Sequence, residues 1–202
     1  MTPQDALHRG VAELRLELPD GAEALLMRYM ALLEKWNRTY NLTAIREPAE
    51  VVSHHLLDSL AVVPHLPVPA HGSLADVGAG AGLPGIPIAL ARPHWRVTLN
   101  DSNEKKVAFL RQAAIELGLS NVAVHAGRVE QWAPQPKFAL VISRAFAGFE
   151  QFRLRCAHLV ASGGVLAAMT GAAPTAGDCR IVALHVPLLD AQRHLVLCPA
   201  GS

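Results

Sequence analysis

The residues with the clearest capacity for chemistry are the four glycines of ADVGAGAGLPG, residues 75–85, which follow a short apolar run. The spacing Gly78-x-Gly80-x-Gly82 is typical of a loop that binds S-adenosylmethionine. The overlapping spacing Gly80-x-Gly82-x-x-Gly85 matches the dinucleotide fingerprint, in which a pyrophosphate lies on a helix N-terminus. Glycine spacing alone therefore leaves a methyl donor and a nicotinamide cofactor as alternatives.

Asp76 bears on this choice, because it lies inside the apolar run, two residues before Gly78. A buried carboxylate is costly unless it accepts hydrogen bonds. One interpretation is that Asp76 caps the backbone of its own loop; the other is that it supports the ammonium group of a bound methionyl moiety. A carboxylate would repel a pyrophosphate, so Asp76 favours the cationic S-adenosylmethionine.

Polar residues also end the next two apolar runs. Asp101, with Ser102 and Asn103, is placed to accept hydrogen bonds from ribose hydroxyls, although all three residues also favour the start of a helix. Val129 and Glu130 follow the third run, where the adenine ring of a nucleoside lies in such sheets. A solvated Glu–Arg surface is the alternative there.

The segment SRAF, residues 143–146, ends the fourth run. An arginine beside a phenylalanine at a strand end is an unusual pair, and we expect Arg144 to lie next to the transferred group, with Phe146 close by.

The elements that must position these residues alternate between strand and helix from Ser73 onward. This alternation predicts an α/β domain with a mostly parallel sheet and helices on both faces. Ligands bind at the carboxyl ends of such strands, so the strand-end residues are expected to meet at one edge. We predict strands at 73–77, 95–101, 121–127, 138–146, 164–170, 180–186 and 193–199, and helices at 86–93, 105–119 and 149–162.

Before this domain the pattern is helical. Apolar residues recur at three- and four-residue spacing from Leu25 to Trp36, and a second helix is predicted from Glu47-Pro48 to just before Pro64. We therefore expect an N-terminal helical region, residues 1–70, packed on a core domain, residues 71–202.

The composition of the 202 residues, 51% hydrophobic and 17% charged, is that of a globular domain, and a net charge of +1 provides no general basic field for nucleic acid. There is no apolar leader and no run of about 18 apolar residues. We expect a cytoplasmic monomer without membrane contact.

Cys156, Cys179 and Cys198 are odd in number and widely spaced, so we expect reduced thiols and neither a disulfide framework nor a zinc site. No metal is expected at the adjacent His54 and His55, because a helix would point them in different directions.

Several motifs together resemble a known family, the bacterial 16S rRNA guanine-N7 methyltransferases, once called glucose-inhibited division protein B. The resemblance runs from about Leu25 to the C-terminus and is carried by ADVGAGAGLPGIPIA (75–89), Asn37-x-x-x-Asn41-Leu42-Thr43, HLLDS (55–59), SRAFA (143–147) and RHL (193–195). It implies a class I methyltransferase fold, S-adenosylmethionine as donor, and a guanine in the 530 loop of 16S rRNA, in the small ribosomal subunit, as acceptor.

The resemblance also assigns residues. It implies cofactor contacts at Gly78, Leu83, Asp101, Ser102, Asn103, Val129 and Glu130, and it places Arg144 beside the methyl group and the acceptor. From the loop pattern we also expect cofactor contacts at Asp76, Gly80 and Gly82, and we expect Arg144 to contact the cofactor and to be the catalytic residue. The resemblance further implies that Asn41, His55, Asp58, Ser59, Arg193 and His194 either contact the RNA or support residues that do, and we expect RNA contacts at Arg38 and Phe146 as well. Further phosphate contacts are expected at Lys35, Arg46, Lys105, Lys106 and Arg111.

The sequence departs from the family pattern at Thr170, where relatives carry a lysine, and in a short connection from Gly171 to Pro187. Arg46 or Arg180 replaces that lysine, or the affinity for RNA is lower. A non-catalytic ribosome-assembly protein and a nicotinamide-dependent oxidoreductase are the alternative functions.

Overall fold

The computed structural model describes residues 1–67, 72–144, 148–172 and 177–200. Its centre is a seven-stranded sheet in the order β3-β2-β1-β4-β5-β7-β6. Strands β1 to β5 pair in parallel, and β7 is antiparallel to both of its neighbours. The predicted α/β fold with a mostly parallel sheet is thus confirmed. The strands are β1 Ser73–Val77, β2 Arg96–Asp101, β3 Val122–Ala126, β4 Phe138–Ser143, β5 Val160–Thr170, β6 Arg180–Leu184 and β7 Arg193–Pro199.

The chain order reverses between β1 and β4, which are neighbours in the sheet. In open α/β sheets, ligands bind outside the carboxyl ends of the strands at such a reversal. Here the two strand ends are tied together, because the Ser143 hydroxyl of β4 donates to the Val77 carbonyl of β1 at 2.8 Å. The glycine loop and Arg144 therefore leave the sheet side by side.

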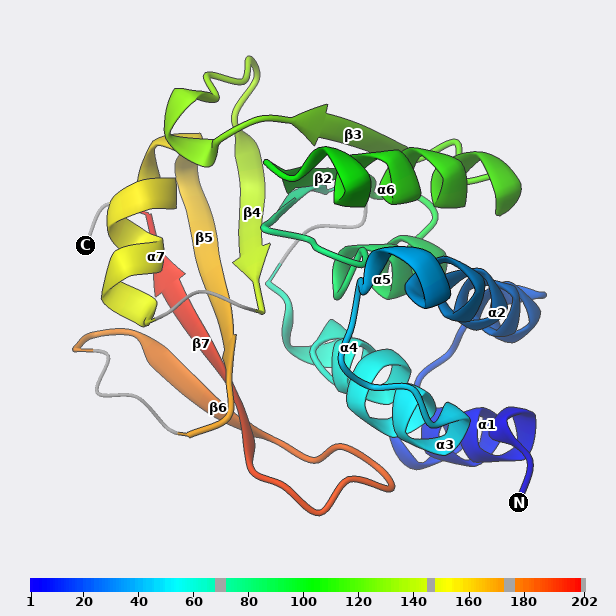
Figure 1. Ribbon diagram of the computed structural model, residues 1–202. Helices are drawn as coiled ribbons and strands as arrows, with labels where there is room; N and C mark the ends of the chain where they lie inside the picture. Colours follow the sequence, from blue (N-terminus) through cyan, green and yellow to red (C-terminus); the bar gives the residue numbers. More distant parts are fainter. Residues whose placement is uncertain (68–71, 145–147, 173–176, 201–202) are drawn as a thin grey trace.

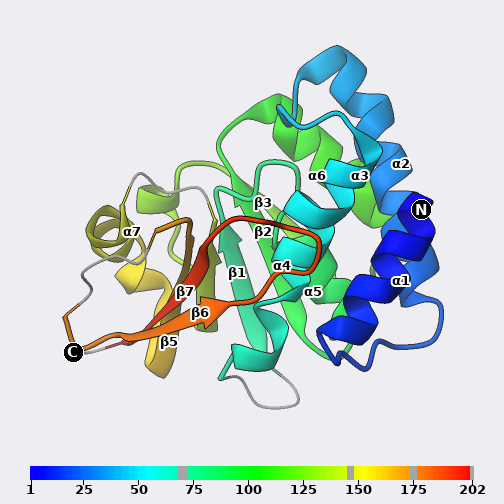
Figure 2. The same cartoon turned by 90° about the horizontal axis from the view of Figure 1, so that it is seen from below.

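Helices bury both faces of this sheet. In β1, Leu74 belongs to the larger apolar cluster and Ala75 to a second one, as expected when successive side chains point to opposite faces. Figures 1 and 2 show the two layers of helices with the sheet between them. The larger cluster contains buried side chains from the helices α1 Pro3–Glu13, α2 Ala22–Tyr40, α5 Gly85–Ala91 and α6 Glu104–Glu116. The helix α7, Phe149–Cys156, contributes to the smaller cluster.

A second helical run of the N-terminal half leads toward the sheet edge (Figure 1). It consists of α3 Pro48–Val51, the π-helix η1 Val52–Leu57 and α4 Asp58–Leu60 without a break, followed by the 3₁₀ turn η2 Val63–His65. The predicted start at Pro48 is correct. The π-helical turn was not predicted, because apolar spacing over so few residues does not separate it from an α-helix.

Two other element predictions differ from the structure. No helix was predicted before Leu25, yet α1 spans Pro3–Glu13, and its N-cap Thr2 forms a capping box with Asp5. The helix predicted over 149–162 ends at Cys156, and after the 3₁₀ turn η4 Ala157–Leu159 the chain enters β5. Pairing of Val160 with Phe138 of β4 outweighs the local helical pattern.

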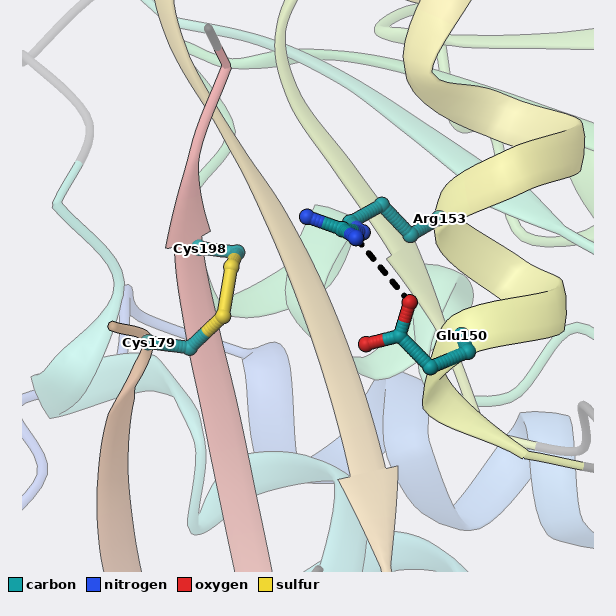
Figure 3. The surroundings of a disulfide bond; sticks show 4 residues. All are labelled: Glu150, Arg153, Cys179 and Cys198. Atoms are coloured by element: carbon teal, nitrogen blue, oxygen red, sulfur yellow. Dashed lines mark ion pairs between the residues drawn. A yellow bond between two sulfur atoms is a disulfide. The ribbon is translucent and has the colours of Figure 1, made fainter. Parts of the chain in front are cut away.

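The expectation of three reduced cysteines is wrong for two of them. Cys179 and Cys198 form a disulfide with a Cα–Cα distance of 4.5 Å, and Cys156 is free and buried. Since Arg180 pairs with Leu197 in the antiparallel ladder of β6 and β7, residues 179 and 198 lie opposite each other. Figure 3 shows the bond at this end of the two strands, with the Glu150–Arg153 ion pair of α7 on the other side of β5. Sequence spacing could not reveal this register.

Within the described ranges, no helix has the length and apolar character needed to cross a membrane. The expected division of the chain after residue 70 falls outside the described residues.

Candidate functional site

Two cavities lie at the carboxyl edge of the parallel strands. The β1–β3 cavity, of about 330 Å³, is lined by Val77, Gly78, Asn100, Asp101, Ser102, Gly127, Arg128, Val129, Glu130 and Arg155. The Arg144 cavity, of about 370 Å³, is lined by Ile45, His54, His55, Asp58, Arg144, Met169, Thr170, Gly171 and Arg193. The two cavities therefore hold about half of the predicted site residues, namely Gly78, Asp101, Ser102, Val129 and Glu130 in the first and His55, Asp58, Arg144 and Arg193 in the second.

The glycine loop exposes its backbone to the β1–β3 cavity. Gly78 has a φ of +67°, and a methyl group added to it would meet no atom within 4 Å. Such a φ favours glycine, so a bound group can approach the loop closely at this residue. Gly82, with a φ of +88°, instead faces inward, where a side chain would overlap Ile86.

Asp101, at the end of β2, braces this loop. Its Oδ2 accepts the Gly80 N–H at 3.0 Å and its Oδ1 accepts the Asn103 N–H at 2.8 Å. Asn103 is the N-cap of α6 and accepts from the backbone of Lys105 and Lys106. Of the two roles that the sequence left open for these residues, Asn103 takes that of helix N-cap, while Asp101 and Ser102 line the cavity where a ribose acceptor was predicted.

Asp76 is fully buried in β1, and its Oδ2 accepts the Gly85 N–H at 2.7 Å. This contact agrees with the interpretation that Asp76 caps the backbone of its own loop. Burial raises the pKa of Asp76 to about 7, against the opposing effects of the Gly85 hydrogen bond and of Arg144. Its Oδ1 is buried and has no hydrogen-bond partner among the described residues.

Tyr29 of α2 is a support of the glycine loop that sequence reasoning missed. It is fully buried, and its hydroxyl donates to the Ala81 carbonyl at 2.6 Å. The sequence had placed Tyr29 on the apolar face of its helix, which is correct for the ring. The polar end of the side chain fixes the loop from the helical side.

The far end of the β1–β3 cavity is formed by the turn after β3. Val129 begins the 3₁₀ turn η3 Val129–Gln131 and is buried, whereas Glu130 is exposed and pairs with Arg155 at 3.2 Å. Asn100, a second residue that the sequence analysis missed, donates from Nδ2 to the Gly127 carbonyl at 2.9 Å. This bond holds the turn against β2.

Arg144 enters its cavity directly after β4. Its Nη1 donates to the His54 carbonyl at 3.0 Å, to His55 Nδ1 at 3.3 Å and to Asp58 Oδ2 at 3.4 Å. Among the described residues, Nε and Nη2 of Arg144 have no acceptor. The guanidinium is therefore held by one nitrogen and presents its other donors to the cavity.

The π-helical turn explains why the His54 carbonyl can accept from Arg144. The Asp58 N–H bonds to the carbonyls of Ser53 and His55, not to that of His54 four residues before it. π-turns occur frequently at functional sites, and this one turns a backbone acceptor toward β4.

Asp58 joins two arginines that lie far apart in the sequence. Its carboxylate is 4% exposed, and it accepts from Arg193 Nε at 3.1 Å as well as from Arg144. Burial raises the pKa of Asp58, and both guanidinium groups oppose this shift. A buried carboxylate shared by two cations fixes their positions, because each partner is costly to leave unpaired.

His55 links Arg144 to the N-terminal helices. Burial and the Arg144 charge lower the pKa of His55 to about 4, so the ring is neutral at pH 7. Nδ1 of His55 lies 3.3 Å from Arg144 Nη1 and 3.1 Å from the His54 carbonyl, and its Nε2 shares a hydrogen bond with the Thr43 hydroxyl at 2.7 Å. The Thr43 N–H in turn donates to Asn37 Oδ1 at 2.9 Å. Asn37, quoted only as part of a motif, therefore anchors the segment over the site.

The remaining predicted residues lie outside both cavities or outside the described residues. Leu83 is buried in the larger apolar cluster, and Asn41 and Arg38 are exposed near the end of α2, bonded to Arg46 and Glu34. His194 is next to Arg193 on β7, but successive side chains of a strand point to opposite faces, and its Nδ1 has no partner in the described structure. Ser59 is buried and its hydroxyl likewise lacks a described partner. Phe146 lies outside the described residues.

Thr170, the position where the family carries a lysine, lines the Arg144 cavity, and its hydroxyl donates to the Ala172 carbonyl at 2.9 Å. The second cation of that cavity is Arg193. Arg180 lies on the edge strand β6, and Arg46 lines a different cavity beside α2. Of the other basic residues expected to contact RNA, Lys35, Lys105 and Arg111 are exposed.

In the part of the chain that the structure describes, no three His, Cys, Asp or Glu side chains are grouped so as to hold a metal ion.

Comparison with curated proteins gives matches over almost the whole chain. The sequence is 48% identical to ribosomal RNA small subunit methyltransferase G of Methylobacillus flagellatus, covering 98% of each chain. It is 49% identical to the protein of the same name from Chromobacterium violaceum, covering 94% of each.

Solved structures show the same fold at lower identity. A SAM-dependent methyltransferase from Aquifex aeolicus superposes with a TM-score of 0.59 at 14% identity, covering 85% of this chain and 98% of that one.

A family model, that of rRNA small subunit methyltransferase G, matches residues 22–177. With this match and two full-length relatives near 50% identity, the chain belongs to the rRNA small subunit methyltransferase G family.

Proposed function

We propose that this protein transfers a methyl group from S-adenosylmethionine to N7 of a guanine in the 530 loop of 16S rRNA. The observation that carries the proposal is the pair of arginines, Arg144 and Arg193, held by one buried carboxylate beside a glycine loop. The loop suits a nucleoside cofactor, and the cations suit an RNA acceptor. Family membership supports the same reaction.

The β1–β3 cavity is lined by the kinds of groups that S-adenosylmethionine requires. The Gly78 backbone is open to a bound group, and Asp101 and Ser102 line the cavity where ribose hydroxyls need acceptors. Val129 and Glu130 line the end suited to adenine. A carboxylate inside the loop strand favours a cationic ligand, and the unpartnered Oδ1 of Asp76 is an acceptor for a donor such as an ammonium group.

When bound, S-adenosylmethionine supplies an electrophilic methyl group on a positively charged sulfur. Guanine N7 already carries an in-plane lone pair, so the chain has no proton to remove before attack. This agrees with the neutral His55, whose two ring nitrogens are occupied by Arg144 and Thr43. The task of the protein is alignment, which contributes about 7–11 kcal/mol in well-oriented reactions.

In this proposal Arg144 orients the guanine. Its Nε and Nη2 donors match the O6 edge of guanine or a phosphate oxygen, and Arg193 lines the same cavity as a second cation. Phe146 is proposed to stack on the displaced base, because stacking contributes about 1–3 kcal/mol per base, comparable to the few kcal/mol that unstacking costs.

The partner is the small ribosomal subunit or its RNA, and we propose a cytoplasmic monomer without metal. A nicotinamide-dependent oxidoreductase is disfavoured by Asp76, which would repel a pyrophosphate beside the loop.

The test is transfer of labelled methyl from S-adenosylmethionine to small subunits that lack the modification, followed by mapping of the labelled nucleotide. We expect label at a single guanine N7. Arg144→Ala should lower transfer at least 100-fold while cofactor affinity, measured by calorimetry, changes less than threefold. Arg153→Ala, an exposed arginine of α7, is the matched control. Calorimetric binding of NADH without binding of the methyl donor would refute the proposal, and cofactor binding without transfer would favour an assembly factor.

A further inference from the structure

A third cavity lies beside the second half of α2. This α2 cavity, of about 150 Å³, is lined by Met30, Leu33, Glu34, Asn37, Arg38, Thr43, Ile45, Arg46, Pro48 and Val51. Ile45 also lines the Arg144 cavity. One residue therefore separates the α2 cavity from the place where the target guanine would lie.

The size and lining of the α2 cavity suit a single flat ring. A protein cavity of about 150 Å³ lined by aliphatic side chains accommodates benzene. Here Met30, Leu33, Ile45 and Val51 provide apolar contact for the faces of a ring. A six-membered ring fits this volume, and a purine, with two fused rings, would fill more of it.

A polar group marks one side of the α2 cavity. Asn37 is 4% exposed, and the orientation of its amide is fixed because Oδ1 accepts the Thr43 N–H at 2.9 Å. Its Nδ2 donors have no acceptor among the described residues. Asn37 lines the cavity, so these donors are available to an acceptor on a ligand, and both pyrimidine bases carry a ring carbonyl, O2.

The rim of the cavity is cationic. Arg38 is paired with Glu34 at 2.8 Å, and Arg46 donates to Asn41 Oδ1 at 2.9 Å. Both arginines are exposed, and exposed pairs are weak and exchange readily. The guanidinium groups are thus available to the phosphate that accompanies a nucleotide base.

We propose that the α2 cavity binds the base of a pyrimidine nucleotide adjacent to the methylated guanine, with Asn37 Nδ2 donating to a base carbonyl and Arg46 contacting its phosphate. This placement next to the guanine rests on the proposed function, in which the Arg144 cavity is the guanine site. Binding of a pyrimidine here would hold the RNA on both sides of Ile45 and keep the target nucleotide out of its stack.

The experiment is a methyl NMR titration of the full-length protein, saturated with S-adenosylhomocysteine, with cytidine and uridine 5′-monophosphates. Guanosine 5′-monophosphate and inorganic phosphate serve as comparison ligands. We expect both pyrimidine nucleotides to shift the methyl resonances of Leu33, Ile45 and Val51, with an affinity at least fivefold higher than that of the guanosine nucleotide for these residues. Equal purine binding, a response to phosphate alone, or shifts confined to Met169 in the Arg144 cavity would each overturn the proposal.

Two variants test the contacts. Asn37→Asp keeps the acceptor for Thr43 but removes the donor, and should weaken cytidine monophosphate binding about fivefold. Thr39→Asp places the same charge on an exposed neighbouring position of α2 and should leave binding within twofold. Arg46→Gln should weaken the binding of cytidine monophosphate but not that of cytidine, which has no phosphate. Because Arg46 is exposed, this variant keeps the test valid if Asn37→Asp does not fold. Equal effects of Asn37→Asp and Thr39→Asp would contradict the proposed contact.

The titration needs no methyl transfer, so the two proposals fail separately. Pyrimidine binding without transfer would leave the α2 cavity as a nucleotide site and overturn the proposed reaction. Transfer to guanine without pyrimidine binding would overturn this inference alone.

Discussion

At the scale of single residues, the site depends on side chains that hold other side chains. Asp58 touches Arg144 and Arg193, and His55 touches Arg144 and Thr43. Neither Asp58 nor His55 has to act on a substrate for the cavity to be assembled. Their effect on the reaction is therefore expected to appear as a loss of alignment, which separates them from residues that bind the cofactor.

Asp58→Asn tests this positioning role. Replacing the carboxylate leaves two guanidinium groups without their shared anion, and a hydrogen bond to a charged group contributes about 1.5–3 kcal/mol. We expect kcat for methyl transfer to fall about 10- to 100-fold and the free energy of unfolding to fall by about 1.5–3 kcal/mol, whereas the Kd for S-adenosylmethionine changes less than threefold. Glu150→Gln, at an exposed position of α7, is the control. A proportional loss of cofactor affinity would place Asp58 in the cofactor site instead.

His55 predicts a pH dependence of stability. The pKa of His55 is lowered from 6.5 to about 4 in the folded protein, so below pH 6.5 the unfolded chain binds a proton that the folded chain does not. The folded state is therefore destabilised as the pH falls from 6.5 toward 4, by up to about 3 kcal/mol. Urea unfolding at pH 7.5 and pH 5.0 measures the change for the wild type and His55→Asn.

Between pH 7.5 and pH 5.0 the wild type should lose more stability, or gain less, than the variant, because the variant lacks the titrating ring while the raised pKa values of Asp76 and Asp58 act in the opposite direction. Buried Asp76 and Asp58 contribute to both proteins and cancel in the comparison. An identical pH dependence of the two proteins would show that His55 titrates normally.

At the scale of elements, α2 supports both cavities along one face. Tyr29 and Asn37 are eight residues apart, about two turns, and both are buried. Tyr29 holds the glycine loop through Ala81, and Asn37 holds the segment before α3 through Thr43. The helix α2 therefore helps to set the geometry of a site whose other residues follow the ends of β1 and β4.

Tyr29→Phe isolates the first of these contacts. The ring stays in the core, but the Ala81 carbonyl loses its donor, which costs about 1–3 kcal/mol for a buried group. We expect the Kd for S-adenosylmethionine to rise about three- to tenfold, together with a lower melting temperature. Tyr40→Phe, on an exposed position of the same helix, should change neither value. A lower melting temperature with unchanged cofactor affinity would limit Tyr29 to packing.

At the scale of the whole molecule, charge is nearly balanced, with 18 basic and 17 acidic residues. A balanced surface cannot bind RNA by its overall field, so affinity has to come from local groups such as Arg38, Arg46, Arg144 and Arg193. A binding mode with few phosphate contacts is also one with little counterion release.

The dependence of RNA affinity on salt measures this directly. With about four phosphate contacts, the logarithm of the association constant should fall with the logarithm of salt concentration with a slope no steeper than about −3 to −4. Arg46→Gln should reduce the slope by about one unit, whereas Arg153→Gln on α7 should leave it unchanged. A slope near −10 would indicate a much larger basic surface than this chain presents.

The sequence by itself determined the sheet, the glycine loop and the strand-end residues Asp101, Val129 and Arg144, because these depend on local patterns and on the rule that parallel strands end at one edge. Local pattern also misled where pairing prevailed, as at Val160, which joins β5 instead of extending α7. Only the tertiary structure decided that Asp58 bridges Arg144 and Arg193, that Tyr29 and Asn37 act from α2, and that Cys179 faces Cys198. These contacts join residues from separate elements, and their geometry follows from packing and strand register, which no short-range spacing encodes.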